Sequence, residues 1–123
     1  MDAGIVLVIE DDESVRRAIQ RLLNASGIST ATYASAEALL AVGPSSSDTC
    51  VITDLTLPGL SGLELLTELR KRGCVQPVIL ITAHDSASMR EEAERCGVAA
   101  LLPKPFHGVA LLGAIEAAIA PSH

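Results

Sequence analysis

Short apolar runs alternate along this chain with longer segments in which apolar residues recur every three or four positions. The apolar runs cover residues 5–9, 29–33, 50–53, 77–81 and 99–102, and the second run is the weakest. Uninterrupted runs of this length are typical of strands in a parallel sheet, because helices cover both faces of such a sheet. The helical segments cover residues 14–26, 35–42, 61–72, 86–96 and 109–119. Five strands alternating with five helices predict an α/β fold, a doubly wound five-stranded parallel sheet with right-handed crossovers.

Serine and glycine residues mark where the predicted helices begin and end. Ser35 is placed to cap the second helix, and Gly27, Gly73 and Gly97 follow the first, third and fourth helices. A serine side chain accepts hydrogen bonds from the free amides of a first turn, and glycine adopts the left-handed conformation that ends many helices. The chain has no internal repeat and no linker, and its 123 residues suit one domain. We therefore predict a single domain over residues 1–123.

Charged and hydroxyl side chains follow the ends of four predicted strands. Glu10 and Asp11 follow the first strand, Asp54 the third, Thr82 the fourth and Lys104 the fifth. Because the carboxyl ends of parallel strands share one edge of the sheet, these side chains should converge there. Three neighbouring carboxylates repel one another, and a hard divalent cation such as Mg²⁺ is the usual compensation. With a lysine cation and a hydroxyl donor beside them, the set is typical of phosphoryl transfer.

Each of these residues also has an ordinary structural interpretation. Taken alone, Asp54 suits the start of a turn, Lys104 a solvated surface and Thr82 a strand. The acidic run at residues 10–13 suits a helix start, where the helix dipole favours negative charge. Only the functional interpretation explains why acid, hydroxyl and base all fall at strand ends. His84, by contrast, is interpreted as an exposed loop residue rather than a catalytic one.

Charge and composition restrict the classes of partner. The net charge of −6 disfavours direct contact with nucleic acid, which requires a basic face. One Tyr and one Phe are the only aromatic residues, so the chain offers no platform for stacking bases. No apolar run approaches the roughly 18 residues of a membrane span, and the first residues lack the basic region of a secretory signal. Three widely spaced cysteines fit reduced packing residues better than disulfides or zinc ligands. We expect a soluble, cytoplasmic domain.

Four motifs resemble the receiver domain of two-component response regulators, and the resemblance extends over essentially the whole chain. They are residues 8–12 (VIEDD), 54–62 (DLTLPGLSG), 81–83 (ITA) and 104–106 (KPF). Residues 15–16, 35–40 and 82–84 are most similar to the FixJ-type branch of that family. The resemblance implies the flavodoxin-like topology of receiver domains. Two alternatives remain open for the parent protein: a single-domain regulator, or a longer regulator whose DNA-binding output domain follows His123. The FixJ-type resemblance favours the second.

The resemblance implies a phosphoacceptor rather than a conventional enzyme. Asp54 would take a phosphoryl group from a phosphohistidine on a sensor histidine kinase, with Thr82 and Lys104 assisting. The domain would support its own magnesium-dependent phosphoryl transfer and dephosphorylation. Its change of conformation would control an output, which the resemblance suggests is transcription.

The resemblance also implies a set of metal ligands. Asp11 and Asp54 would bind Mg²⁺ directly, together with the backbone carbonyl of Thr56. Glu10 stands where an Asp is more frequent in the family, and its longer side chain would reach the metal through water. Asp12 is a weaker candidate, because the acidic pair of the family aligns better with the two preceding residues.

One departure from the family concerns switching. Leu101 stands in the fifth strand where the family often has Tyr or Phe. If Thr82 moves toward the phosphoryl group, this smaller side chain would have to fill the vacated space, so the coupling between Thr82 and the fifth strand would be weaker or differently built. Phosphorylation is expected to promote a homodimer through the face formed by residues 86–96, the fifth strand and the last helix.

Three alternatives share parts of the pattern. A flavodoxin-like FMN-binding protein should present hydroxyl and glycine donors after its first strand, whereas this chain presents acids. A phosphatase of the haloacid dehalogenase type needs a second Asp two residues after its nucleophile, where this chain has Thr56. A receiver-like module that is never phosphorylated is disfavoured because the whole residue set is present.

Overall fold

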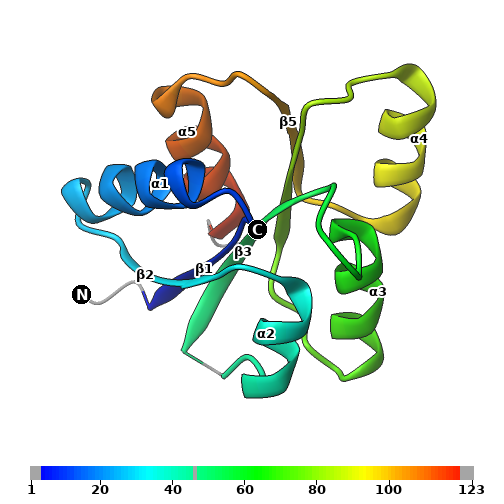
Figure 1. Cartoon of the computed structure of the whole chain (residues 1–123), viewed down its shortest axis with the longest axis horizontal. Helices are drawn as coiled ribbons and strands as arrows, with labels where there is room; N and C mark the ends of the chain where they lie inside the picture. Colours follow the sequence, from blue (N-terminus) through cyan, green and yellow to red (C-terminus); the bar gives the residue numbers. More distant parts are fainter. Residues whose placement is uncertain (1–3, 46, 120–123) are drawn as a thin grey trace.

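In the computed structural model, which describes residues 4–45 and 47–119, a parallel sheet separates two layers of helices (Figure 1). The strands are β1 (Ile5–Ile9), β2 (Ser29–Tyr33), β3 (Asp48–Asp54), β4 (Val78–Thr82) and β5 (Ala100–Pro103). The helices are α1 (Glu13–Ala25), α2 (Ala36–Val42), α3 (Gly62–Lys71), α4 (Ala87–Cys96) and α5 (Gly108–Ile119). All strand pairs are parallel in the order β2-β1-β3-β4-β5, which confirms the predicted doubly wound sheet. The expected domain limits at residues 1 and 123, and residue 46 of the polar loop before β3, lie outside the described residues.

Alternate residues of each strand supply two separate cores. Leu7 and Ile9 of β1 pack with α2, α3 and α4, whereas Val6 and Val8 pack with α1 and α5. The same division of helices is visible on the two sides of the sheet in Figure 1. Because side chains alternate along a strand and both faces are covered, the central strands have continuous apolar sequences.

Hydroxyl side chains cap three of the helices at the ends nearest the carboxyl edge of the sheet. Ser35, Ser61 and Ser86 accept hydrogen bonds from backbone amides of α2, α3 and α4, which confirms the predicted role of Ser35. Helix α1 begins one residue earlier than predicted, because Asp12 is its N-cap and accepts from the amide of Val15 at 3.1 Å. The Asp12 side chain is therefore engaged in starting the helix.

Strand β3 is longer than its predicted range of residues 50–53. It runs from Asp48 to Asp54 because it pairs with β1 on one side and β4 on the other. Strand β4 likewise extends to Thr82, which pairs in register with Pro103 of β5. As a result, two of the predicted site residues are the last residues of strands.

The cysteines differ in environment. Cys50 lies in the core beneath α1 and α5, and burial raises the pKa of its thiol to about 12, so it stays protonated. Cys74 is partly buried against the other core. Cys96 is exposed at the end of α4, so the expectation of a packing role is wrong for this residue. All three are free thiols, as predicted.

Within the described part of the chain, no helix combines the length and apolar character that crossing a bilayer requires.

Candidate functional site

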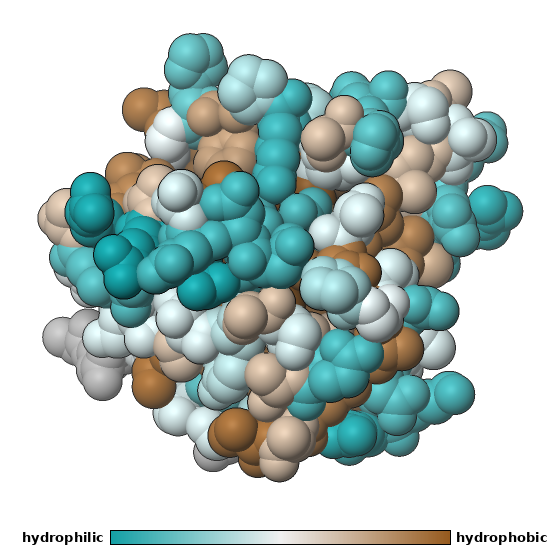
Figure 2. All heavy atoms as spheres, in the orientation of Figure 1, coloured by the Kyte–Doolittle hydropathy of each residue, from teal (hydrophilic) through white to brown (hydrophobic). Residues whose placement is uncertain are grey.

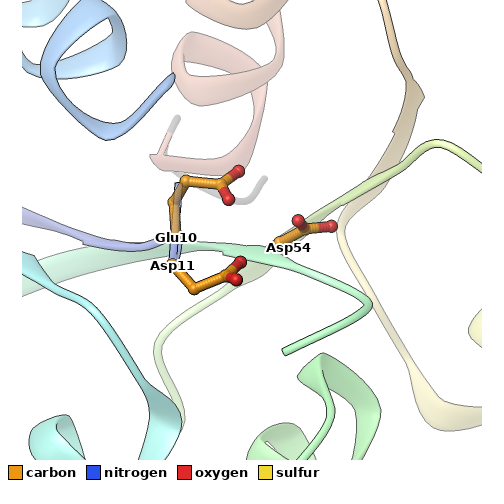
Figure 3. A group of neighbouring side chains, drawn as sticks. All are labelled: Glu10, Asp11 and Asp54. Atoms are coloured by element: carbon orange, nitrogen blue, oxygen red, sulfur yellow. The ribbon is translucent and has the colours of Figure 1, made fainter. Parts of the chain in front are cut away.

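Three carboxylates meet at the carboxyl edge of the sheet. Glu10 and Asp11 follow β1, and Asp54 ends the neighbouring strand β3. One oxygen from each carboxylate can be chosen so that all three lie within 4.8 Å of one another. Figure 3 shows Glu10 and Asp11 leaving the same strand end with their carboxylates directed toward Asp54. Glu10 and Asp54 are buried, at 1% and 8% exposure, whereas Asp11 is exposed and leaves the cluster open to solvent.

The donor set fits a hard cation. Every candidate ligand atom is an oxygen, which suits Mg²⁺ better than a soft metal. The predicted additional ligand, Thr56, lies beside Asp54, because its amide approaches Asp54 Oδ1 at 3.4 Å. On the face of the molecule shown in Figure 2, hydrophilic side chains gather over α1 and extend toward the centre of the view. The sequence prediction that Glu10, Asp11 and Asp54 come together is confirmed.

Lys104 supplies the cation of the site. Its Nζ lies 3.1 Å from Glu10 Oε1 and 3.1 Å from Asp54 Oδ2. Burial lowers the pKa of Lys104, but the hydrogen bonds and negative charges of the two carboxylates outweigh burial and raise it overall. The ammonium therefore remains charged between its partners. The predicted convergence of Lys104 with the acidic residues is confirmed.

Glu10 is the most enclosed of the three acids. Burial is the main cause of its raised pKa, and the charge of Asp54 adds to the rise. The amide of Asp12 and the Lys104 ammonium oppose it by hydrogen bonding to the carboxylate. Arg16 fixes the backbone at this point, because its Nη1 donates to the Glu10 carbonyl at 2.8 Å. Sequence analysis did not predict this contact, which joins residues six positions apart.

Thr82 lies one strand away from Asp54. Asp54 pairs in register with Ile81, the residue before Thr82, and the Thr82 carbonyl accepts from the Lys104 amide at 2.7 Å. The Thr82 side chain is fully buried, and its hydroxyl oxygen accepts from the amide of His84 at 2.8 Å. The hydroxyl proton remains free to be donated elsewhere. His84 itself is exposed, as predicted.

The loop from β4 to α4 is fixed at both ends. At its start, the His84 amide is bound to Thr82. At its end, Arg90 of α4 donates two hydrogen bonds of 2.7 Å to the carboxylate of Asp85. Arg90 also lines a groove of about 470 Å³ between α4 and β5, together with Leu101. Hydrogen bonds thus connect the strand end at Thr82 to the surface of α4.

A second groove adjoins the site on its other side. It has a volume of about 370 Å³ and is mostly apolar. Its lining comes from α1 and from the segment after Lys104, and consists of Ser14, Val15, Ala18, Ile19, Leu22 and Phe106.

Gly62 brings α3 against the backbone of Asp54. A Cβ at this position would lie 2.6 Å from the Asp54 carbonyl oxygen and 2.7 Å from Leu80 Cδ1. The Gly62 amide also donates to the Leu55 carbonyl at 2.9 Å. The absence of a side chain therefore lets α3 begin directly beneath the strand end.

Gly62→Ala should lower the free energy of unfolding by about 1–3 kcal/mol, because the added methyl would overlap the Asp54 carbonyl, which belongs to the backbone, and the buried side chain of Leu80. Gly113 of α5 provides the matched control, since nothing lies within 4 Å of its added Cβ. Gly113→Ala should instead be neutral or raise stability by up to about 1 kcal/mol through helix propensity. Urea denaturation of both variants measures the difference. Equal stability of the two variants would contradict the close packing described for Gly62.

Comparison with known proteins gives a consistent result. The family model of the response regulator receiver domain matches residues 6–116. The transcriptional regulatory protein FixJ of Azorhizobium caulinodans is 40% identical over 117 residues, which cover 95% of this chain and 56% of that protein. Nodulation protein W of Bradyrhizobium diazoefficiens is 38% identical over 115 residues, covering 94% of this chain and 51% of that protein. The crystal structure of FixJ-N superposes with a TM-score of 0.89 at 33% identity, covering 100% of this chain and 98% of that one. The chain thus spans about half the length of the first curated relatives.

Proposed function

This chain belongs to the response regulator receiver domain family, and from that premise we propose that Asp54 accepts a phosphoryl group from a histidine kinase with the help of Mg²⁺. The observation that carries the proposal is the position of Asp54. It ends the central strand with one oxygen 3.1 Å from Lys104 and with the carboxylate of Asp11 beside it. Family membership also decides against the flavin-binding and dehalogenase-type alternatives.

The proposed transfer is a substitution at phosphorus. An oxygen of Asp54 forms a bond to the phosphorus atom as the bond from phosphorus to the kinase imidazole nitrogen breaks, and the imidazole leaves. Lys104 stabilises negative charge on the transferred group, and the free hydroxyl proton of Thr82 is available to the same oxygens. Asp11, Asp54 and the Thr56 carbonyl would hold Mg²⁺, which supplies charge compensation when bound.

Receiver domains partner with histidine kinases, and the groove beside the site supports such a partner here. The groove between α1 and Phe106 is apolar and lies next to the residues that follow Glu10 and Lys104. A kinase that brings its phosphohistidine to Asp54 must cover this area. We assign the groove to apolar side chains of the kinase, and the cytoplasmic location expected of the domain agrees with this partner.

Signal output is proposed to pass along the loop from β4 to α4. If the Thr82 hydroxyl turns toward a phosphoryl group, the His84 amide loses its acceptor, and the loop is then held mainly by Asp85 and Arg90. Opening this pair would free the Arg90 side chain to change its position in the groove that it lines beside Leu101. Such a path requires no aromatic side chain in β5. Because relatives of this chain include transcriptional regulators such as FixJ, the proposed output is control of transcription.

Labelling of the unmodified domain tests the function. With acetyl phosphate and Mg²⁺, the intact mass should rise by one phosphoryl group, and a chelator of divalent cations should suppress the rise by at least about tenfold, because transfer relies on charge compensation. Adding Mg²⁺ in excess of the chelator should restore it. Labelling that persists unchanged in the chelator, or that never occurs, would contradict the proposal.

A further inference from the structure

We propose that Glu37 of α2 is a positioning residue for the loop from β3 to α3, residues 55–61, and that it supports Mg²⁺ binding through this loop. The inference rests on the proposed function, because the loop directly follows Asp54 and carries the proposed ligand Thr56. Glu37 belongs to the first turn of α2 and is not one of the three clustered carboxylates. Its influence on the site must therefore pass through the backbone of the loop.

The Glu37 carboxylate joins α2 to the far part of this loop. Its Oε2 accepts a hydrogen bond from the Leu60 amide at 2.8 Å, across 23 positions of sequence. The amide of Glu37 itself, which belongs to the helix, also donates to the carboxylate, and these two hydrogen bonds lower the pKa of the Glu37 carboxyl. One carboxylate thus holds a helix amide and a loop amide together.

Gly59 gives the carboxylate room to approach the loop. A Cβ at this position would overlap Glu37 Oε2 and would lie 3.0 Å from Glu37 Cδ. The φ angle of Gly59 is +80°, a conformation that glycine adopts without steric cost. The turn therefore presents bare backbone to the side chain of α2, and the contact with the Leu60 amide depends on it.

Hydrogen bonds to the sheet and to α3 hold the two ends of the loop. At its start, the Leu55 amide donates to the Ile81 carbonyl at 2.7 Å. At its end, the Gly62 amide donates to the Leu55 carbonyl at 2.9 Å. The turn between them is exposed to solvent at residues 56 and 58–59. The hydrogen bond from α2 restrains this exposed part of the loop.

The position of the loop matters because Mg²⁺ requires near-ideal octahedral geometry. The Thr56 carbonyl would be one of its protein ligands, and a displaced loop would move that oxygen away from the carboxylates. Groups that orient metal ligands from outside commonly change affinity by about 10- to 100-fold. Because Glu37 acts through several loop residues, we expect a smaller effect, about three- to tenfold.

Two substitutions separate positioning from simple charge. Glu37→Gln removes the negative charge but keeps an oxygen that can accept from the Leu60 amide, whereas Glu37→Ala removes both. Titration of the unphosphorylated domain with MgCl₂, followed by its amide resonances, measures the dissociation constant. Glu37→Ala should raise this constant about three- to tenfold, and Glu37→Gln should stay within about twofold of wild type. Equal weakening in the two variants would mean a charge effect and would overturn the proposal.

Ionic strength and a matched control test the same distinction. In 1 M KCl, where the Debye length is about 3 Å, an effect of distant charge should vanish, but the ratio between Glu37→Ala and wild type should persist. Glu68→Ala makes the same chemical change in the second half of α3, at a side chain whose ion pair with Arg72 is exposed. This variant should bind Mg²⁺ as wild type.

The Leu60 amide reports the contact directly. Its proton resonance should move upfield in Glu37→Ala, because the carboxylate acceptor is lost, and its exchange with solvent should become faster. An unchanged Leu60 resonance would contradict the contact. Urea denaturation confirms that the variants are folded, and Glu37→Asp, whose side chain is one carbon shorter, replaces Glu37→Ala if the latter does not fold.

Phosphoryl labelling separates this inference from the proposed function. With acetyl phosphate, Glu37→Ala should be labelled more slowly than wild type at limiting Mg²⁺ and at nearly the wild-type rate at saturating Mg²⁺. A wild-type domain that is never labelled would contradict the role of Asp54, while the Mg²⁺ and Leu60 measurements would still test Glu37. A labelled wild type with equal Mg²⁺ dissociation constants in all variants would overturn the role of Glu37 alone.

Discussion

Replacing Asp54 with Asn is expected to abolish phosphoryl labelling while the fold persists. The amide matches the carboxylate in size but is a poor nucleophile and a poor metal ligand, so both functions of the side chain are lost. The fold should tolerate the change, because Lys104 keeps Glu10 as a counter-charge at 3.1 Å. Mass spectrometry of the intact protein after incubation with acetyl phosphate and Mg²⁺ measures the label.

Asp48→Asn is the matched control, because it makes the same chemical change at the opposite end of β3. Asp48 accepts from the amide of Ser45 at 2.7 Å and is remote from the acidic cluster along the strand. This variant should be labelled as wild type. Undiminished label in Asp54→Asn would remove Asp54 as the acceptor.

Phosphorylation of Asp54 is expected to convert monomers into dimers through the face formed by α4, β5 and α5. The outer side of α5 includes Val109, which is 82% exposed, and α4 presents charges of both signs in Arg90, Glu91 and Glu94. A shift from about 1% to about 99% of the active conformation requires the phosphoryl group to favour that state by about 5.5 kcal/mol. Sedimentation velocity of phosphorylated and unphosphorylated protein at matched concentrations measures the dimer fraction.

Lys104→Ala should weaken this dimerisation more than it weakens labelling, because Lys104 directly follows β5 and would link the phosphoryl group to that strand, in addition to the proposed path through the loop from β4 to α4. Comparing samples with equal phosphorylated fractions separates the two effects. Lys71→Ala, which removes the same charge from the exposed end of α3, should behave as wild type. Identical monomer fractions with and without phosphorylation would rule out this mechanism for the isolated domain.

The sequence was sufficient to predict the architecture and the convergence of the site. Continuous apolar runs identified the parallel strands, because burial on both faces removes alternation. Once strands were placed, topology alone brought Glu10, Asp54 and Lys104 to one edge, since carboxyl ends of parallel strands lie together. The strand ends were less predictable, because Asp54 and Thr82 are held in the ladder by pairing with neighbours distant in sequence.

Side-chain partners lay beyond sequence reasoning for a different reason. The contact of Glu10 with Lys104 joins residues 94 positions apart and depends on rotamers that no local pattern encodes. The pairing of Asp85 with Arg90 was also missed, because a spacing of five residues is not a regular helical pair. The buried face of α5 is a further example: Leu111 and Ile115 enter the core, whereas Val109, equally apolar, faces outward.

The central position of β3 in the sheet bears on which parts of the domain can move when Asp54 is modified. Neighbouring strands hold β3 on both sides, and α3 begins directly against the Asp54 carbonyl, so the proposed acceptor lies on a strand that is packed on three sides. Strand β5, in contrast, pairs with a single strand among those described. Strand β2, at the other edge, also pairs with a single one of these strands. If a charged group added at Asp54 displaces part of the sheet, we therefore expect the displacement at the edge strands and their loops rather than in β3. The order of the strands, more than the identity of any one side chain, would then determine which parts of the domain move.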